Sequence, residues 1–234
     1  MRARVLAALE PVVLACVPVA LALAAFFQFD QTALLTFAVA VGALAVFFAG
    51  WEASSPALRQ VMPAAVLGAL AAAGRILFAP VPDVKPVSAI CILAGAVFGR
   101  RVGFMTGALA ALTSNFFFGQ GAWTPWQMYA WGLVGYLAGV LSERGAFETR
   151  EDAPRRAVVC AYGFLSALLY GALLNTWTLV GFVHPLTWEA ALLTYGAGLP
   201  FDLVHAVSTV AFLLVIYVPW KKKLDRVRTK YALR

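Results

Sequence analysis

The sequence predicts an all-α fold, a polytopic membrane helical bundle, and three observations support this. The first is composition, because 62% of the residues are hydrophobic and only 12% are charged, whereas soluble domains are about 45–50% apolar and about 25% charged. The second is that apolar runs recur at a length that spans a bilayer, since about 20 helical residues cross the hydrocarbon core. The third is the distribution of basic residues, which fall in alternate loops and at the termini.

Eight apolar segments are expected to form the spans. The first two have ionisable residues only at their edges, Glu10 and Asp30. The fourth is short and needs residues from its flanks. The expected spans are roughly 9–27, 32–50, 57–79, 87–99, 102–118, 126–142, 157–182 and 199–219.

These spans suggest a division of the chain into three parts. Residues 1–50 are interpreted as an N-terminal transmembrane helix pair, 57–219 as a six-helix core and 220–234 as a basic cytoplasmic tail. A seamless eight-helix bundle is the alternative. The first segment also weakly resembles a cleaved signal peptide, but the second full span follows it after only a few residues.

The basic residues predict the orientation. With eight spans, all of the 18 basic residues except Arg75 and Lys85 fall on one side of the membrane. Loops rich in Lys and Arg stay in the cytoplasm. We therefore expect a multi-pass protein of the cell membrane with both termini in the cytoplasm, and we attribute the net charge of +7 to topology and anionic lipid rather than to nucleic-acid binding.

The last apolar stretch, 186–219, is too long for one span. Gly196, Gly198 and Pro200 interrupt it, and proline followed by an acid suits the first turn of a helix. We therefore predict a short surface helix over 186–196 and a final span that begins near Pro200. The alternative is one continuous, kinked helix with Asp202 inside the membrane.

The loop around 114–128 joins two spans and carries no charge, unlike ordinary membrane loops. It is rich instead in amide side chains, tryptophan and glycine. Polar residues from other helix ends are expected at the same outer level, and a concave site with a few converging polar groups is the usual form of a small-molecule pocket. The candidate binding residues are Arg75, Asn115, Gln120, Trp123, Trp126, Gln127, Asn175, Asp202 and His205.

Each of these residues also has a purely structural interpretation. The tryptophans suit the membrane interface, and the asparagines can join helix to helix. Arg75 can pair with Asp83 or Asp202, and Asp202 can bond His205. Lys85 is expected to be solvated. The pocket hypothesis therefore depends on the joint placement of these groups.

Enzymatic activity is not expected. The sequence has no Ser–His–Asp order, no metal-ligand cluster, no cofactor motif and no phosphate-binding loop. Its three cysteines lie apart in apolar segments and are interpreted as small core residues. Two rival functions stay open: a membrane enzyme or assembly factor that uses Asp202 and His205, and a stand-alone secondary transporter, although no inverted repeat is visible.

Small residues recur at four-residue spacing, which lets helices approach closely in lipid. Most such glycine pairs suit packing inside the bundle. The third span has small residues around much of its circumference, more than one neighbour requires; they include Ala65, Gly68, Ala69 and Ala72. A second contact, with another protein, would use the part of this surface that the neighbouring helix leaves free.

The segment 57–219 resembles the S components of energy-coupling-factor vitamin transporters. The resemblance lies in the alanine-rich helix Val61–Arg75, the motif Pro82–Pro86, the segment Ser114–Gln127 and the run Pro200–His205. The first two helices depart from the usual six-helix pattern.

The resemblance implies a substrate-binding subunit with an outward pocket closed by loops. Its implied partners are a transmembrane coupling subunit, contacted through the small residues of the third span, and two cytoplasmic ATPases that power uptake. The subunit is thought to topple in the membrane to release its vitamin. Cobalamin or another corrinoid is favoured as cargo, because this branch looks like predicted cobalamin S components. Riboflavin is the second choice, stacked on Trp123 or Trp126.

Overall fold

The computed structural model describes residues 2–27, 32–54, 56–149 and 153–233. Apart from one isolated bridge between Glu148 and Pro154, the regular structure of these residues is helical, which confirms the all-α prediction. Asp30, Arg150 and Arg234 lie outside the described residues. The helices are α1 (Arg2–Phe27), α2 (Thr32–Ala53), α3 (Leu58–Leu77), α4 (Val87–Phe98), α5 (Arg100–Phe118), α6 (Trp123–Glu143), α7 (Arg156–Phe182) and α8 (Trp188–Lys230).

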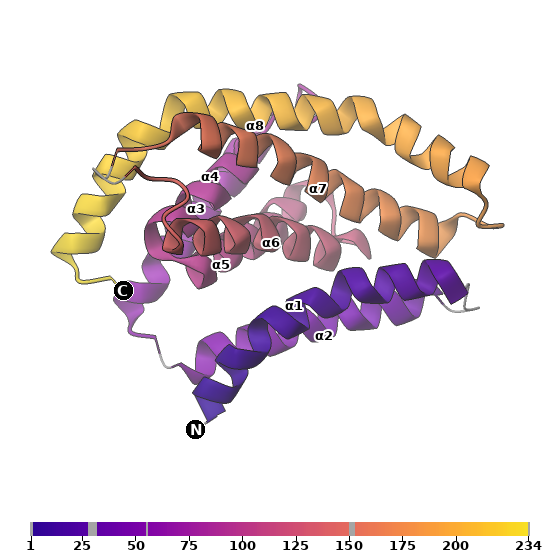
Figure 1. The fold of residues 1–234 in the computed structure, drawn as a ribbon, viewed down its shortest axis with the longest axis horizontal. Helices are drawn as coiled ribbons and strands as arrows, with labels where there is room; N and C mark the ends of the chain where they lie inside the picture. The colour runs from indigo at the N-terminus through magenta and orange to yellow at the C-terminus, as the bar shows by residue number, and fades with distance from the viewer. Residues whose placement is uncertain (1, 28–31, 55, 150–152, 234) are drawn as a thin grey trace. The chain divides into compact units, whose positions relative to one another are not determined.

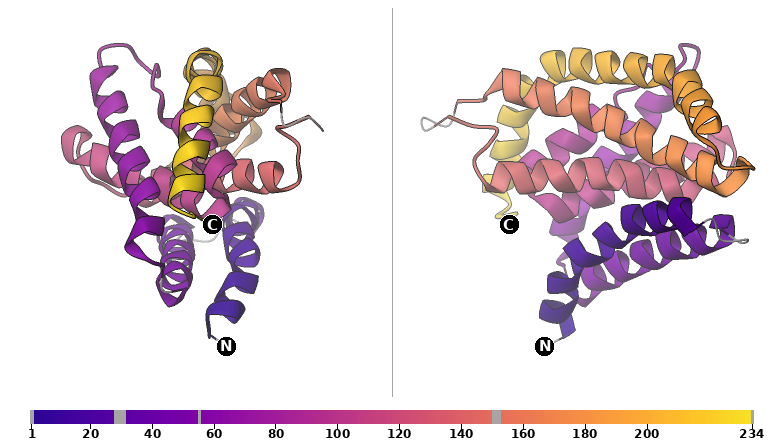
Figure 2. Two further views of the ribbon diagram at one scale, coloured as in Figure 1. Left: turned by 90° about the vertical axis from the view of Figure 1, so that its left-hand side faces the viewer. Right: turned by 45° about the vertical axis from the view of Figure 1, so that its right-hand side comes forward.

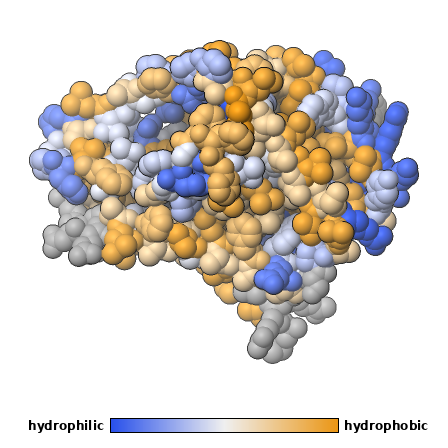
Figure 3. Space-filling view, turned by 180° about the vertical axis from the view of Figure 1, so that it is seen from behind, coloured by the Kyte–Doolittle hydropathy of each residue, from blue (hydrophilic) through white to orange (hydrophobic). Residues whose placement is uncertain are grey.

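Five of these helices, α1, α2, α3, α7 and α8, are long and apolar enough to cross a membrane. Hydrophobic residues cover much of the face that Figure 3 shows. The helix α4 has only 12 residues, as the short fourth segment suggested, and α4 to α6 are the most buried elements. Helices surrounded by other helices do not need an apolar surface all round, so α5 and α6 can carry glycine and polar residues.

The chain forms two compact units. One contains residues 1–56 and 171–200, and the other contains residues 57–170 and 201–234. The helices α7 and α8 therefore each contribute to both units. The first unit holds α1 and α2 together with parts of these two helices, whereas the predicted N-terminal pair held α1 and α2 alone.

In the first unit, α1 and α2 lie side by side (Figures 1 and 2). The apolar side chains that α1 buries are Leu14, Val17, Leu21 and Ala24. Their spacing of three and four residues places them on one face of a helix. Several valine and leucine side chains elsewhere on both helices are exposed, as in a helix pair that faces lipid.

In the second unit, α4, α5 and α6 approach one another through glycines. A Cβ added at Gly103 or Gly95 would collide with the backbone of Gly135, and one added at Gly107 would collide with that of Trp131. These contacts confirm that the glycine pairs of α4 to α6 serve packing inside the bundle. Gly99 differs, because it has a φ of +90° in the turn between α4 and α5.

The prediction for the end of the chain is wrong. One helix, α8, runs from Trp188 to Lys230 through Pro200, in place of a short helix and a span that begins at Pro200. Proline removes one hydrogen bond from a helix, but ending the helix inside an apolar segment would leave several backbone groups without partners. The alternative of one continuous helix is the one observed, so Asp202 lies inside α8 rather than at its start.

Candidate functional site

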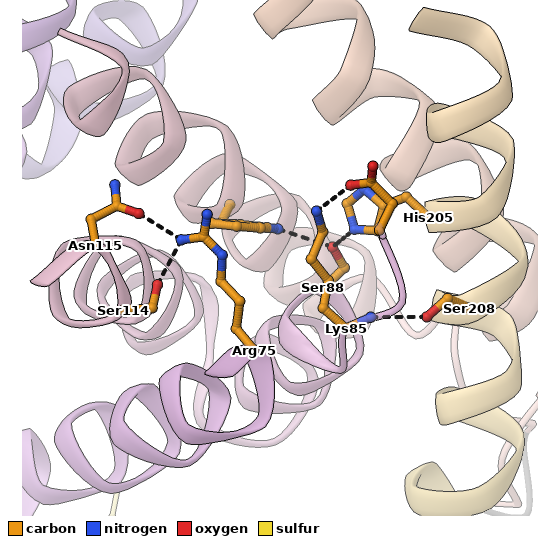
Figure 4. A network of polar contacts seen from close by, with 9 residues as sticks. Arg75, Lys85, Ser88, Ser114, Asn115, His205 and Ser208 are labelled. Carbon is orange, nitrogen blue, oxygen red and sulfur yellow. Dashed lines mark hydrogen bonds and ion pairs between the residues drawn. The ribbon is translucent and has the colours of Figure 1, made fainter. Parts of the chain in front are cut away.

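Arg75, in the last turn of α3, reaches the end of α5 inside the second unit. Its Nη1 donates to Ser114 Oγ and to Asn115 Oδ1, each at 2.7 Å (Figure 4). Its guanidinium carbon lies 4.6 Å from the ring centroid of Phe118 and 5.0 Å from that of Trp131. The hydrogen bonds and ring contacts of the arginine are therefore made with hydroxyl, amide and aromatic groups, whereas the structural interpretation offered Asp83 or Asp202 as partners.

Asn115 extends this contact into the turn between α5 and α6. Its Nδ2 donates to Gln127 Oε1 at 2.8 Å and to Thr124 Oγ1 at 3.0 Å. The hydroxyl of Thr124 donates in turn to Gln120 Oε1 at 2.9 Å, and Gln120 Nε2 donates to the carbonyl of Leu112 at 3.0 Å. Four of the predicted residues, Arg75, Asn115, Gln120 and Gln127, thus belong to one hydrogen-bonded network.

A second cluster lies on α4, α6, α7 and α8 around Ser88. Its hydroxyl is 2.9 Å from His205 Nε2 and accepts a hydrogen bond from Trp131 Nε1 at 3.2 Å. The ring of Tyr170 stacks on Trp131 at 4.6 Å and meets His205 edge-on at 5.1 Å. His205 therefore bonds Ser88, and Trp131 connects this cluster to the guanidinium of Arg75.

The loop between α3 and α4 closes over the same region of the second unit. Lys85 forms an ion pair with Asp83, and its backbone N–H donates to Ser208 Oγ of α8 at 3.2 Å (Figure 4). Its side chain is 14% exposed, so the expectation of a solvated lysine is wrong. Burial lowers the pKa of Lys85 from its ordinary value, and the carboxylate of Asp83 opposes that shift.

The two loop tryptophans differ in exposure. Trp123 begins α6 and is 41% exposed, and a Cβ at Gly121 would collide with its ring. The side chain of Trp126 is 1% exposed. In this conformation Trp123 presents a ring to the surroundings, whereas Trp126 faces neighbouring side chains. Stacking of cargo on either ring stays a prediction.

The two remaining predicted residues are Asn175 and Asp202. Asn175 belongs to the first unit, where α7 and α8 approach so closely that a Cβ at Gly198 would lie 2.6 Å from its amide. Nearby in that unit, the hydroxyls of Thr176 and Tyr195 are 2.5 Å apart. Asp202 is half-buried on α8 of the second unit. Their roles in binding stay predictions.

The small residues of α3 fall on two faces. Gly68 and Ala72 are buried, and a Cβ at Gly68 would lie 3.0 Å from Leu109 Cβ of α5. Ala65 and Ala69 are exposed. The first pair therefore packs inside the bundle, and only the second pair offers a surface to another protein in this structure.

Sequence reasoning missed Ser88, Thr124, Trp131 and Tyr170. A single hydroxyl or aromatic residue within an apolar run resembles ordinary core, so no local signal distinguished Ser88 or Trp131. Thr124 lies inside the loop that the sequence singled out, four residues after Gln120, and this position was the one available signal that it belongs to the site.

The chemistry of the network suits binding rather than catalysis. Side-chain amides both donate and accept hydrogen bonds, and a guanidinium donates in a fixed plane. The aromatic rings add flat apolar surface. Within the described residues no group of three or more His, Cys, Asp or Glu side chains is arranged to hold a metal ion.

Comparison with known proteins identifies one family. The model of the "ECF-type riboflavin transporter, S component" family matches residues 56–222, which is most of the chain. This range contains the whole hydrogen-bonded network, and α1 and α2 lie outside it. No solved structure matches the chain.

Proposed function

The chain belongs to the family of ECF-type riboflavin transporter S components, and on that premise we propose that its cargo is riboflavin. Membership makes it a membrane-embedded substrate-binding subunit of an energy-coupling-factor transporter, and not an enzyme. It also implies a vitamin substrate and association with a membrane subunit and ATPase subunits.

The observation that carries the proposal is the network around Arg75 and Asn115. Riboflavin has a flat ring system with an imide edge that both donates and accepts hydrogen bonds. Asn115 Nδ2 now donates to Gln127 Oε1 at 2.8 Å. If this hydrogen bond breaks, the two side-chain amides can instead donate to and accept from the imide edge of the cargo. Phe118, which is 43% exposed and over which the guanidinium of Arg75 lies, supplies aromatic surface for the ring.

A corrinoid is the second candidate, and the uncharged aromatic segment 114–128 favours it. Its ring is much larger than that of riboflavin, so its entry would break more of the hydrogen bonds within the network around Arg75 and Asn115. Riboflavin requires the smaller rearrangement of these side chains, and the description of the matched family names that vitamin.

The proposed surface for the coupling subunit is the exposed face of α3 at Ala65 and Ala69. Small exposed side chains allow a partner helix to approach the backbone closely. We further propose that both termini are cytoplasmic, because the basic residues predict it. The network around Arg75 then lies at the outer side, where a vitamin arrives.

The decisive experiment is a vitamin panel on the purified full-length chain. Small molecules that copurify are identified by mass spectrometry, and the thermal shift is then measured with riboflavin, cobalamin and other vitamins. Riboflavin is expected to give the largest shift and to lose its fluorescence on binding. A larger shift with cobalamin would replace riboflavin as cargo, and no shift with any vitamin would reject a vitamin-binding role.

A matched pair of variants tests the site. Gln127→Ala removes a side chain that touches Asn115, and its riboflavin affinity is expected to fall about tenfold, the loss of about one hydrogen bond. Gln60→Ala is the control, because Gln60 caps the opposite end of α3, where its Oε1 accepts from Ala57 N at 3.0 Å. Equal affinities for the two variants would place the site elsewhere.

A further inference from the structure

A groove of about 450 Å³ opens in the second unit between the start of α3 and the C-terminal arm, residues 220–233. The two segments lie beside each other in Figures 1 and 2. Met62 and Val66 line it from α3, and Leu224 and Val227 line it from the arm. Met62 and Val66 are 50% and 55% exposed, so the groove leaves apolar side chains uncovered.

The arm that forms one wall is firmly attached to the unit. Arg228 Nη1 donates to the carbonyl of Val97 at 2.8 Å, beside the end of α4. Lys221 pairs with Glu148 at 2.6 Å and with Asp225 at 2.8 Å. Leu233 is only 6% exposed. The arm is therefore a fixed wall of the groove within the second unit.

Positive charge surrounds the mouth of the groove. Arg59 and Tyr231 line it, and Lys230 Nζ lies 5.4 Å from the ring centroid of Tyr231. Lys223 precedes Val227 by four residues, so the two residues lie on the same face of the arm. No acidic side chain is among the described residues that line the groove.

The position of these groups along α3 matches the layers of a bilayer. Arg59 is the second residue of the apolar span Leu58–Leu77, where lipid headgroups are expected. Val66 follows seven residues later, about 10 Å deeper along the helix. Charge therefore lies at headgroup level and apolar surface lies at the level of the acyl chains.

We propose that this groove binds one anionic phospholipid, with its phosphate at the basic mouth and an acyl chain along Met62 and Val66. An acyl chain covers apolar side chains that would otherwise contact water or disordered lipid. Each basic residue near an anionic membrane surface contributes about 1 kcal/mol, or about fivefold in affinity. The site would join α3 to the arm and stabilise the second unit.

The test uses the purified full-length chain in detergent, with dioleoyl-phosphatidylglycerol as probe and dioleoyl-phosphatidylcholine as the neutral comparison. Native mass spectrometry counts bound lipid, and thermal unfolding measures stabilisation. We expect one phosphatidylglycerol to be retained and to raise the unfolding temperature more than phosphatidylcholine does. Neutralising Arg59→Gln and Lys230→Gln together is expected to lower that affinity at least fivefold. Val66→Trp, which fills the groove, is expected to abolish retention.

The control is the double variant Lys222→Gln and Arg226→Gln, which removes the same charge from exposed positions that do not line the groove. It is expected to bind phosphatidylglycerol as the unmodified chain does. Equal loss in both double variants, or equal binding of the two lipids, would overturn the proposal in favour of general attraction to anionic surfaces. Protection of residues 58–67 from hydrogen exchange by the coupling subunit and not by phosphatidylglycerol would assign the groove to a protein partner.

Discussion

At the scale of single residues, the hydroxyl of Ser88 bonds the ring nitrogens of two side chains in the candidate site, Trp131 and His205. Replacing it with alanine leaves Trp131 Nε1 and His205 Nε2 without this partner in a buried place, which costs about 1–3 kcal/mol. Ser88→Ala is therefore expected to lower the unfolding temperature and to shift tryptophan fluorescence. Ser166→Ala is the control, because within the described part of the chain its buried hydroxyl donates to the carbonyl of Gly163 in its own helix. Similar losses in the two variants would contradict a special role for Ser88.

Residue types predicted part of the site and missed the rest for a physical reason. Arg75, Asn115, Gln120 and Gln127 were predicted because a polar side chain in an apolar segment requires a partner. The prediction of a solvated Lys85 failed because its backbone N–H bonds Ser208, a residue 123 positions away in sequence, which holds this loop against α8. Hydrogen bonds between distant helices leave no local pattern in a sequence.

At the scale of elements, glycines distinguish close packing from open space. A Cβ at Gly135 of α6 would collide with the backbone of Gly103 of α5, whereas a Cβ at Gly42 of α2 would meet nothing within 4 Å. Gly135→Ala is expected to destabilise the chain by several kcal/mol through overpacking. Gly42→Ala is expected to stabilise it by up to about 1 kcal/mol, because alanine favours the helix. Thermal unfolding in detergent measures both, and destabilisation of similar size by both substitutions would contradict the packing argument.

Helices were predictable where the length of an apolar run indicated them, and less so where glycine and proline were used to set a boundary. Seven of the eight predicted segments occur as separate helices among the described residues, with ends shifted by at most seven positions, whereas the last, 199–219, is part of the longer helix α8 (Trp188–Lys230). Pro200 suggested a helix start, yet α8 continues through it. In an apolar surrounding one missing hydrogen bond costs less than the ends of two helices, so the usual meaning of proline fails there.

At the scale of the whole molecule, the N-terminal helices α1 and α2 lie outside the region that matches the family. The family match begins at residue 56 and the second unit begins at residue 57. A chain that begins at residue 56 is therefore expected to bind riboflavin within about threefold of the full chain, a change below about 1 kcal/mol. Its unfolding temperature is expected to fall, because Ala33 of α2 packs beside Gly181 of α7 in the first unit. Loss of binding in a truncated chain that still unfolds cooperatively would show that α1 and α2 belong to the binding core.

Assembly with the coupling subunit gives the last test, because it separates binding from transport. Ala69 is exposed on α3, and Gly68 beside it packs on α5. Ala69→Trp is expected to leave the thermal stability and riboflavin affinity unchanged and to abolish copurification of the coupling subunit and uptake. Gly68→Trp is expected to unfold the chain, since its side chain would overlap Leu109. Leu214→Trp, at a residue 59% exposed on α8, is the control and should assemble normally. Normal assembly of Ala69→Trp would move the partner surface away from this face of α3.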